Sequence, residues 1–252
     1  DTDIFKKLEN YDVSSIGPNL PKDKFVFFWN NRNARRKQSG SVIWWFNELL
    51  SRIGEDKAIL VMHTEPFDPN GQDLVQIIEH LKLQGKVLLS TKKMPSEELA
   101  KFYNYADCTI NVADAEGFGL STLESLSCET PIIVTMTGGL QEQVTDGEEW
   151  FGYGLEPTSK SIIGSQQVPW IYEDRIDGNE LVDSMEKMYN LSDSARSAMG
   201  TKGRNHVLKN YNMEDYHANW HNFMKNLHET HGSWSTRKNY KNYKIMEITN
   251  EV

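Results

Sequence analysis

Cysteines, long apolar runs and a leader pattern are the features that this chain has least of. It holds two cysteines in 252 residues, Cys108 and Cys128, and neither has the companions expected of a zinc site or a redox motif. Both stand in apolar surroundings, so we expect buried free thiols in a reducing compartment, the cytoplasm, with a disulfide between them as the alternative. No apolar run approaches the ~20 residues that span a bilayer, and Asp1 begins no signal-peptide pattern. We therefore expect no transmembrane segment.

The motifs of several enzyme classes are also missing. The sequence has no nucleophile elbow, no Walker loop and no zinc-protease pattern. Its histidines and carboxylates show no metal-ligand spacing, so we expect neither a metal nor another cofactor. The first predicted strand is followed by Asn-Arg-Asn-Ala-Arg in place of G-x-G-x-x-G, which argues against a nicotinamide-dependent enzyme. The net charge of −9 argues against nucleic acid as a partner.

What the sequence does contain is a regular alternation of short apolar runs and helical patterns. The apolar runs, at 25–29, 58–63, 86–90, 108–112 and 132–135, are nearly continuous, which is typical of a parallel sheet covered on both faces. Helical patterns at 39–53, 72–83 and 96–105 lie between them. This alternation predicts an α/β fold, a doubly wound parallel sheet with helices on both faces.

After Gly139 the pattern becomes less regular. Residues 148–175 mix glycine, proline, serine and aromatics, which predicts an irregular excursion with one strand at 170–172. Extra C-terminal helices follow at 178–189, 192–210 and 213–231. We expect one domain over 25–231 and a basic tail, either mobile or a docking arm, over 232–252.

Polar or glycine-bearing segments follow each of the five predicted strands. In chain order they read "NNRNARRK", "HTEPF", "STKKMP", "ADAEGFG" and "MTGG". Because ligands bind beyond the carboxyl ends of the strands in an open parallel sheet, we expect these segments to meet at one edge.

The stretch "EGFGLSTLE" predicts a strand, a tight turn and then a helix that begins near Gly119 or Leu120. A helix N-terminus presents free backbone N–H groups, and small residues let a ligand approach them. Glu116 and Glu124 flank this turn, and a carboxylate is suited to accept hydrogen bonds from sugar hydroxyls. The alternative is structural, with the glutamates stabilising the helix dipole and the glycines serving only the turn.

The densest basic cluster outside the tail is "RNARRK", which contains Arg32, Arg35, Arg36 and Lys37. Cations at this position could neutralise a diphosphate at the same edge of the sheet. A solvated charged loop is the alternative.

These segments resemble the donor-binding domain of retaining glycosyltransferases of family 4, which have the B-type fold of two Rossmann-like domains. The E-x7-E signature of that family fits Glu116 and Glu124, with "PSEELAKFYNYADCTINVA" before the pair and "ETPIIVTMTGG" after it. The family also places an arginine and a lysine after the first strand, a pattern that Arg32 and Lys37 meet. The resemblance covers residues 25–147.

The resemblance implies a role for each matching position. Arg32 and Lys37 would hold the diphosphate of a nucleotide sugar, Glu116 would face the transferred sugar, and these three would form the catalytic set. Glu124 would take the ribose hydroxyls. The residues that it assigns to donor binding are Arg36, Thr91, Met94, Gly117, Phe118, Gly119, Leu120, Ser121 and Glu124. Arg35 and Arg36 compete with Lys37 for the phosphate role.

The resemblance further implies that part of the enzyme is not in this chain. "DTDIFKKL" resembles the linker after the first Rossmann-like domain, so residues 1–24 would be a linker remnant. The N-terminal half, which would bind a saccharide, lipid or protein acceptor, would then be missing. We expect the donor half of a hexosyl-transferring enzyme, poorly active alone. The alternative is a catalytically silent nucleotide-sugar-binding module or assembly partner.

Overall fold

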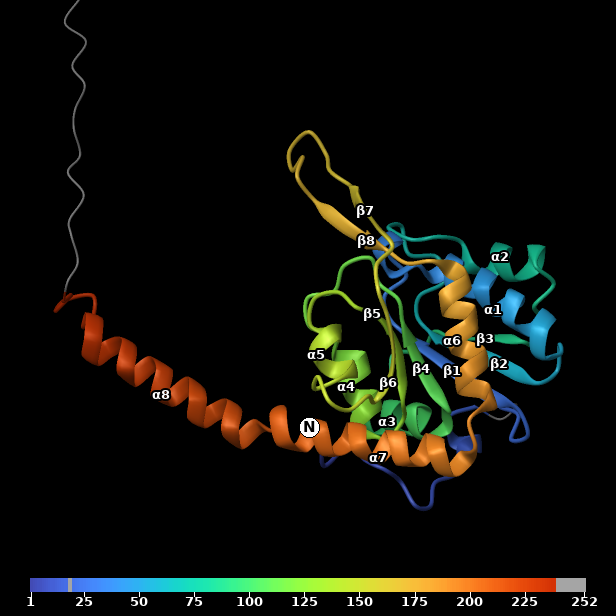
Figure 1. Ribbon diagram of the computed structural model, residues 1–252, viewed down its shortest axis with the longest axis horizontal. Coiled ribbons are helices and arrows are strands. Elements are labelled where there is room, and N and C mark those ends of the chain that lie inside the picture. The colour runs from blue at the N-terminus through green and yellow to red at the C-terminus, as the bar shows by residue number, and fades with distance from the viewer. Residues whose placement is uncertain (18–19, 239–252) are drawn as a thin grey trace, which may run out of the picture. The chain divides into compact units, whose positions relative to one another are not determined.

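The computed structural model describes residues 1–17 and 20–238, and the chain divides into two compact units, Asp1–Asn210 and Tyr211–Val252. The first unit contains a six-stranded sheet in the order β3-β2-β1-β4-β5-β6, in which every neighbouring pair is parallel (Figure 1). Its strands are β1 (Phe25–Asn30), β2 (Ala58–His63), β3 (Val87–Ser90), β4 (Cys108–Asn111), β5 (Ile132–Thr135) and β6 (Gly152–Leu155). The predicted doubly wound α/β class is confirmed.

Helices cover both faces of this sheet. One face carries α1 (Ser39–Ile53), α2 (Leu74–His80) and α6 (Gly178–Asn190). The other face carries α3 (Ser96–Tyr105), α4 (Leu120–Ser127), α5 (Leu140–Val144) and α7 (Asp193–Asn210). Helix α2 is shorter at both ends than the predicted 72–83. Asp73 caps its start by accepting from Gln76 N at 3.0 Å, and after its end Lys82 adopts a left-handed φ of 57°.

Two apolar clusters, one on each face, hold these layers together. Successive side chains of β1 alternate between them, so Phe27 and Trp29 pack under α1 while Val26 and Phe28 pack under α3. All four side chains are at most 2% exposed, which explains why the run shows no polar alternation. Cys108 and Cys128 are buried and free, as predicted.

The irregular excursion predicted at 148–175 contains more regular structure than expected. Its first part is β6, the edge strand of the sheet. Its second part is an antiparallel hairpin of β7 (Ser159–Ile162) and β8 (Tyr172–Arg175), so the strand expected at 170–172 begins later. The hairpin projects from the body of the first unit (Figure 1).

The second unit contains α8 (Met213–His231), the last predicted helix. Asn212 caps it by accepting from Asp215 N at 2.8 Å. Tyr216, Trp220 and Phe223 form a row along it, with ring centroids 6.4 and 5.7 Å apart. Residues 239–252 of the predicted tail lie outside the described residues.

Candidate functional site

The strand order reverses between β1 and β4, so the segments that follow these two strands leave in opposite directions, and in open parallel sheets ligands bind at this position. Buried side-chain atoms that lack a hydrogen-bond partner among the described residues gather at this edge. Four of the five residues that carry them, Asn31, Thr64, Asn111 and Thr135, end or directly follow β1, β2, β4 and β5, and the fifth, Trp29, is the last but one residue of β1. Unpaired buried polar groups are costly and often mark a functional site, so the carboxyl edge is the place to look for one.

Lys37 and Glu116 meet at this edge as an ion pair. Lys37 ends a short 3-10 helix, η2 (Arg35–Lys37), and Gln38 then adopts φ 57°, which turns the chain into α1. The Lys37 ammonium donates to Asn31 Oδ1 at 2.7 Å and to Glu116 Oε2. The Lys37 side chain is 8% exposed and the Glu116 side chain 11%. Burial lowers the pKa of Lys37, and the hydrogen bond to Glu116 opposes that shift.

Two other cations of the basic segment, Arg32 and Arg36, also have partners in neighbouring loops. Arg32 binds Asp68 with both ends of its guanidinium, at 2.6 and 3.1 Å, and holds the pKa of Asp68 at about 2. Arg36 donates to the backbone oxygen of Ala115 at 2.5 Å. Arg32 and Arg36 therefore stay at the predicted edge, already engaged by neighbouring loops.

The glycine-rich turn between Glu116 and α4 is shaped by close backbone contacts. Gly119, at φ 88°, turns the chain into α4, which begins at Leu120 as predicted. A Cβ on Gly138 would lie 1.7 Å from the backbone oxygen of Glu116, so the "TGG" segment packs directly against the turn. Phe118 and Leu120 are 49% and 68% exposed. The first residue of α4, Leu120, is thus exposed to solvent, while Gly119 before it is buried and Ser121 after it is half-buried.

Glu124 lies within α4 and is half-buried. Its Oε2 accepts from the Tyr103 hydroxyl at 2.7 Å, and that hydroxyl accepts from Asn30 Nδ2 at 2.8 Å. Burial raises the pKa of Glu124, and the hydrogen bond from Tyr103 opposes the shift. Tyr103 is not among the residues that the sequence motifs predict for the site.

Thr91 and Met94, the residues predicted to lie near a nucleobase, follow β3. Thr91 is exposed, while Met94 is half-buried against the cluster under α3. In the strand order, β2 separates them from β1. They share the carboxyl edge with the other site residues, and their role stays a prediction.

The base of the β7–β8 hairpin binds three of the site loops. Arg35 donates to both oxygens of Glu173, at 2.7 and 2.6 Å, and Arg175 donates to Asp114 at 2.5 Å. Asp174 accepts from the Thr137 hydroxyl at 2.6 Å, and its N–H donates to Asp114 O at 2.8 Å. We call Glu173, Asp174 and Arg175 the hairpin root. It joins the segments after β1, β4 and β5, which carry Lys37, Glu116 and the "TGG" turn.

Glu173→Gln should lower the free energy of unfolding by about 1–2 kcal/mol at neutral pH, because Glu173 is 4% exposed while Arg35 is half-exposed. Arg35 holds the pKa of Glu173 below its ordinary 4.5, so this stabilisation is present above pH 4.5 and is lost as the pH falls through the folded-state pKa. Urea unfolding of both forms at pH 7 and pH 4 measures it. Glu186→Gln, which weakens the surface pair with Arg52, is the matched control and should cost under ~0.5 kcal/mol. Equal costs for the two variants would contradict the prediction.

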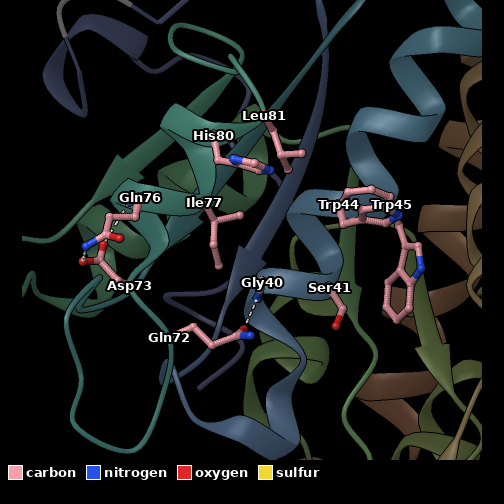
Figure 2. Close-up of a pocket in the computed structure, with 10 residues that line it drawn as sticks. All are labelled: Gly40, Ser41, Trp44, Trp45, Gln72, Asp73, Gln76, Ile77, His80 and Leu81. Carbon is pink, nitrogen blue, oxygen red and sulfur yellow. Dashed lines mark hydrogen bonds between the residues drawn. The ribbon is translucent and has the colours of Figure 1, made fainter.

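A separate groove lies between α1 and α2 and has a volume of about 670 Å³ (Figure 2). Trp44, Trp45 and His80 line it together with Gln72 and Asp73. Some of its polar groups are hydrogen-bonded within the groove: Gln72 Oε1 accepts from Gly40 N at 2.8 Å, and Gln76 Nε2 donates to Asp73 Oδ2 at 3.0 Å. None of the predicted site residues lines this groove.

The described residues contain neither a membrane-spanning helix nor a metal-binding cluster. No described helix is long and apolar enough to cross a membrane. Residues 1–17 and 20–238 contain no group of three or more histidine, cysteine, aspartate or glutamate side chains placed to hold a metal ion.

Comparisons with known proteins agree with this architecture. The family model described as "Glycosyl transferases group 1" matches residues 18–188. N-acetyl-alpha-D-glucosaminyl L-malate synthase of Bacillus anthracis is 24% identical over 160 residues, which are 64% of this chain and 39% of that protein. D-inositol 3-phosphate glycosyltransferase of Acidothermus cellulolyticus is 46% identical over 55 residues, which are 22% of this chain and 12% of that protein.

Solved structures share the fold. Sucrose-phosphate synthase from Thermosynechococcus elongatus superposes with a TM-score of 0.70 at 21% identity, over 91% of this chain and 51% of that one. The C-terminal domain of a glycosyl transferase group 1 family protein (LpcC) from Francisella tularensis has a TM-score of 0.64 at 20% identity, over 84% of this chain and 98% of that domain.

The sheet order and the glycine-rich turn at its switch point define a Rossmann-like α/β domain. The chain belongs to the family Glycosyl transferases group 1, whose model matches more than half of its residues, and it has the fold of the family's C-terminal domain. It spans 39% of the Bacillus anthracis relative and about half of the sucrose-phosphate synthase chain.

Proposed function

We propose that this chain is the nucleotide-sugar-binding half of a retaining glycosyltransferase that transfers a hexosyl group. The observation that carries the proposal is the buried Lys37–Glu116 pair, which lies beside an exposed helix N-terminus at the β1–β4 switch point. A cation, free backbone N–H groups and a carboxylate together match a diphosphate joined to a sugar. Among structures with this fold, one from Anabaena was solved with UDP and glucose.

In this proposal the phosphates lie between Lys37 and the backbone N–H groups of Leu120 and Ser121, with Arg32 and Arg36 nearby. Binding requires the Lys37 ammonium to share its interactions between Glu116 and phosphate oxygen. Glu116 then turns towards the hydroxyls of the sugar, for which the exposed Gly117 and Phe118 leave room. Glu124 accepts from the ribose hydroxyls.

The chemistry proposed is substitution on one face of the sugar. The bond between the anomeric carbon and the leaving phosphate oxygen breaks, and the acceptor oxygen forms its bond on the same side. The acceptor proton passes to the leaving diphosphate. Lys37 and the helix N-terminus stabilise the charge that develops on that diphosphate, which is the main contribution a preorganised site makes. No protein nucleophile takes part.

The acceptor and the cellular setting are also proposals. A saccharide, lipid or protein acceptor would be bound by an N-terminal domain that faces the carboxyl edge of the sheet, and the whole enzyme would act in the cytoplasm. The second candidate function is a nucleotide-sugar-binding module without transfer. One observation supports this second function. Every cation of the site is paired with a protein carboxylate or carbonyl, and such pairs also stabilise a site that only binds its ligand.

We expect at least one member of a panel of UDP-, GDP- and ADP-sugars to bind saturably in titration calorimetry. Glu124→Ala should weaken that binding about 10- to 100-fold, because hydrogen bonds to a carboxylate are strong in a half-buried site. Glu48→Ala, which removes an exposed helical glutamate on α1, is the matched control and should bind like the unmodified chain. A panel without any binder would contradict the proposed function. Release of sugar onto an acceptor by the chain joined to an N-terminal half separates the enzyme from the silent module.

A further inference from the structure

The hydroxyl of Tyr103 makes two hydrogen bonds, and the packing of the Tyr103 ring does not depend on them. Its ring is fully buried and packs edge-on against Phe28 and Phe5, with centroids 5.1 and 6.0 Å apart. A phenylalanine would fill this space equally well, and it would bring no hydroxyl into a buried position. The hydroxyl is therefore explained by what it touches, which is Glu124 on one side and Asn30 on the other.

The direction of these two hydrogen bonds is fixed by the groups at the ends. Asn30 Nδ2 can only donate, so the Tyr103 oxygen accepts from it at 2.8 Å. An ionised Glu124 can only accept, so the Tyr103 proton points at Oε2, at 2.7 Å. The chain Asn30–Tyr103–Glu124 thus runs one way, from the end of β1 through α3 to α4.

Tyr103 binds only one of the two carboxylate oxygens of Glu124. A carboxylate offers about four lone-pair positions, and Tyr103 takes one of them on Oε2. The donated bond favours the charged carboxylate and restrains Oε2, which leaves Oε1 to accept from a ligand. Burial alone would favour the protonated form of Glu124, which accepts hydrogen bonds less well.

We propose that Tyr103 is a positioning residue of the nucleoside site, one that holds the Glu124 carboxylate charged and aimed at the ribose hydroxyls. The proposal rests on the proposed function, because it needs a ribose at Glu124. It adds Asn30 and Tyr103 to the residues that determine whether the site distinguishes a ribonucleotide from a deoxyribonucleotide.

The test compares UDP, GDP and ADP with their 2′-deoxy and 3′-deoxy counterparts, by calorimetry on the full chain. Tyr103→Phe should reduce the preference for the ribonucleotide about tenfold, while the affinity for the deoxy forms changes little. Tyr105→Phe is the matched control on the same helix, because its hydroxyl donates to Pro21 O at 2.5 Å instead. It should keep the preference of the unmodified chain.

Asn30→Ala serves as a second variant, since it removes the donor to Tyr103 and keeps the ring. It should reduce the same preference by a smaller factor. An unchanged or increased ribonucleotide preference in Tyr103→Phe would overturn the inference, even if the melting temperature fell. In that case nucleotide binding by the unmodified chain would still support the proposed function. If no nucleotide of the panel bound the unmodified chain, both would be overturned.

Discussion

Gly138→Ala is expected to lower the free energy of unfolding by about 3–5 kcal/mol and to reduce nucleotide affinity more than 100-fold. The added Cβ would lie 1.7 Å from the backbone oxygen of Glu116, in a position where φ is 51°. Backbone cannot move aside as a flexible side chain does, so the turn that carries Glu116 must shift. Denaturant unfolding and calorimetric titration measure the two effects.

Gly147→Ala is the matched control for this substitution. Gly147 also has positive φ, 95°, yet a Cβ there would meet nothing within 4 Å. It should cost about 1 kcal/mol, the usual penalty of a left-handed conformation for alanine, and leave nucleotide binding unchanged. If Gly138→Ala costs no more than this control, the close packing of the "TGG" segment on the site turn is not what fixes its shape.

Lys37→Met is expected to weaken binding of a nucleoside diphosphate about 100-fold, because it removes a buried cation from the proposed phosphate site. It should also destabilise the fold, since Glu116 would lose its ion-pair partner in a site that is 11% exposed. Adding Glu116→Gln should restore much of the stability and none of the phosphate affinity. Lys86→Met, which removes the partner of Glu55, is the control and should leave binding unchanged. Equal affinities for Lys37→Met and Lys86→Met would contradict the phosphate role.

The same lysine should make the binding of a diphosphate weaker at alkaline pH. Burial lowers the pKa of Lys37 from its ordinary 10.5, so the ammonium is lost at a lower pH than on an exposed lysine. Affinity for the diphosphate should therefore fall as the pH rises through that lowered value. The Lys37→Met variant should not show this pH dependence.

The core of the fold could be predicted because its signals are local. The run at 58–63 and the helix at 39–53 were predicted with the bounds that the structure shows, since buried strands and amphipathic helices each have their own pattern. The edge strand β6 was missed because its sequence is Gly-Tyr-Gly-Leu, and glycine normally indicates a loop. Here a Cβ on Gly152 would lie 1.8 Å from Ile132 O, so the close approach of β5 requires glycine inside a strand.

The sequence predicted that the candidate-site segments meet at one edge of the sheet, but it did not predict how their side chains pair. The segments after the strands meet at one edge because the topology of a parallel sheet brings them there. Their partners, however, are distant in the sequence: Asp68 lies 36 positions after Arg32, and Glu173 lies 138 positions after Arg35. The sequence contains these four cations, but no pattern in it indicates which distant carboxylates pair with them. Tyr103 was missed for the same reason, because its hydroxyl donates to Glu124 on α4, a helix that follows later in the chain.

The hairpin root and the rest of the hairpin are under different constraints during evolution. The root residues Glu173 and Arg175 share charge partners with Arg35 and Asp114, so a change of sign at one of these positions calls for a compensating change at another. Beyond the root, the bonds join neighbouring hairpin residues, as Ile163 N donates to Ile171 O and Ser165 N to Val168 O. We therefore expect residues 163–171 to tolerate changes of length and sequence that the four charged positions do not tolerate one at a time. The hairpin is a place where a lineage can acquire a new surface without rebuilding the site beneath it.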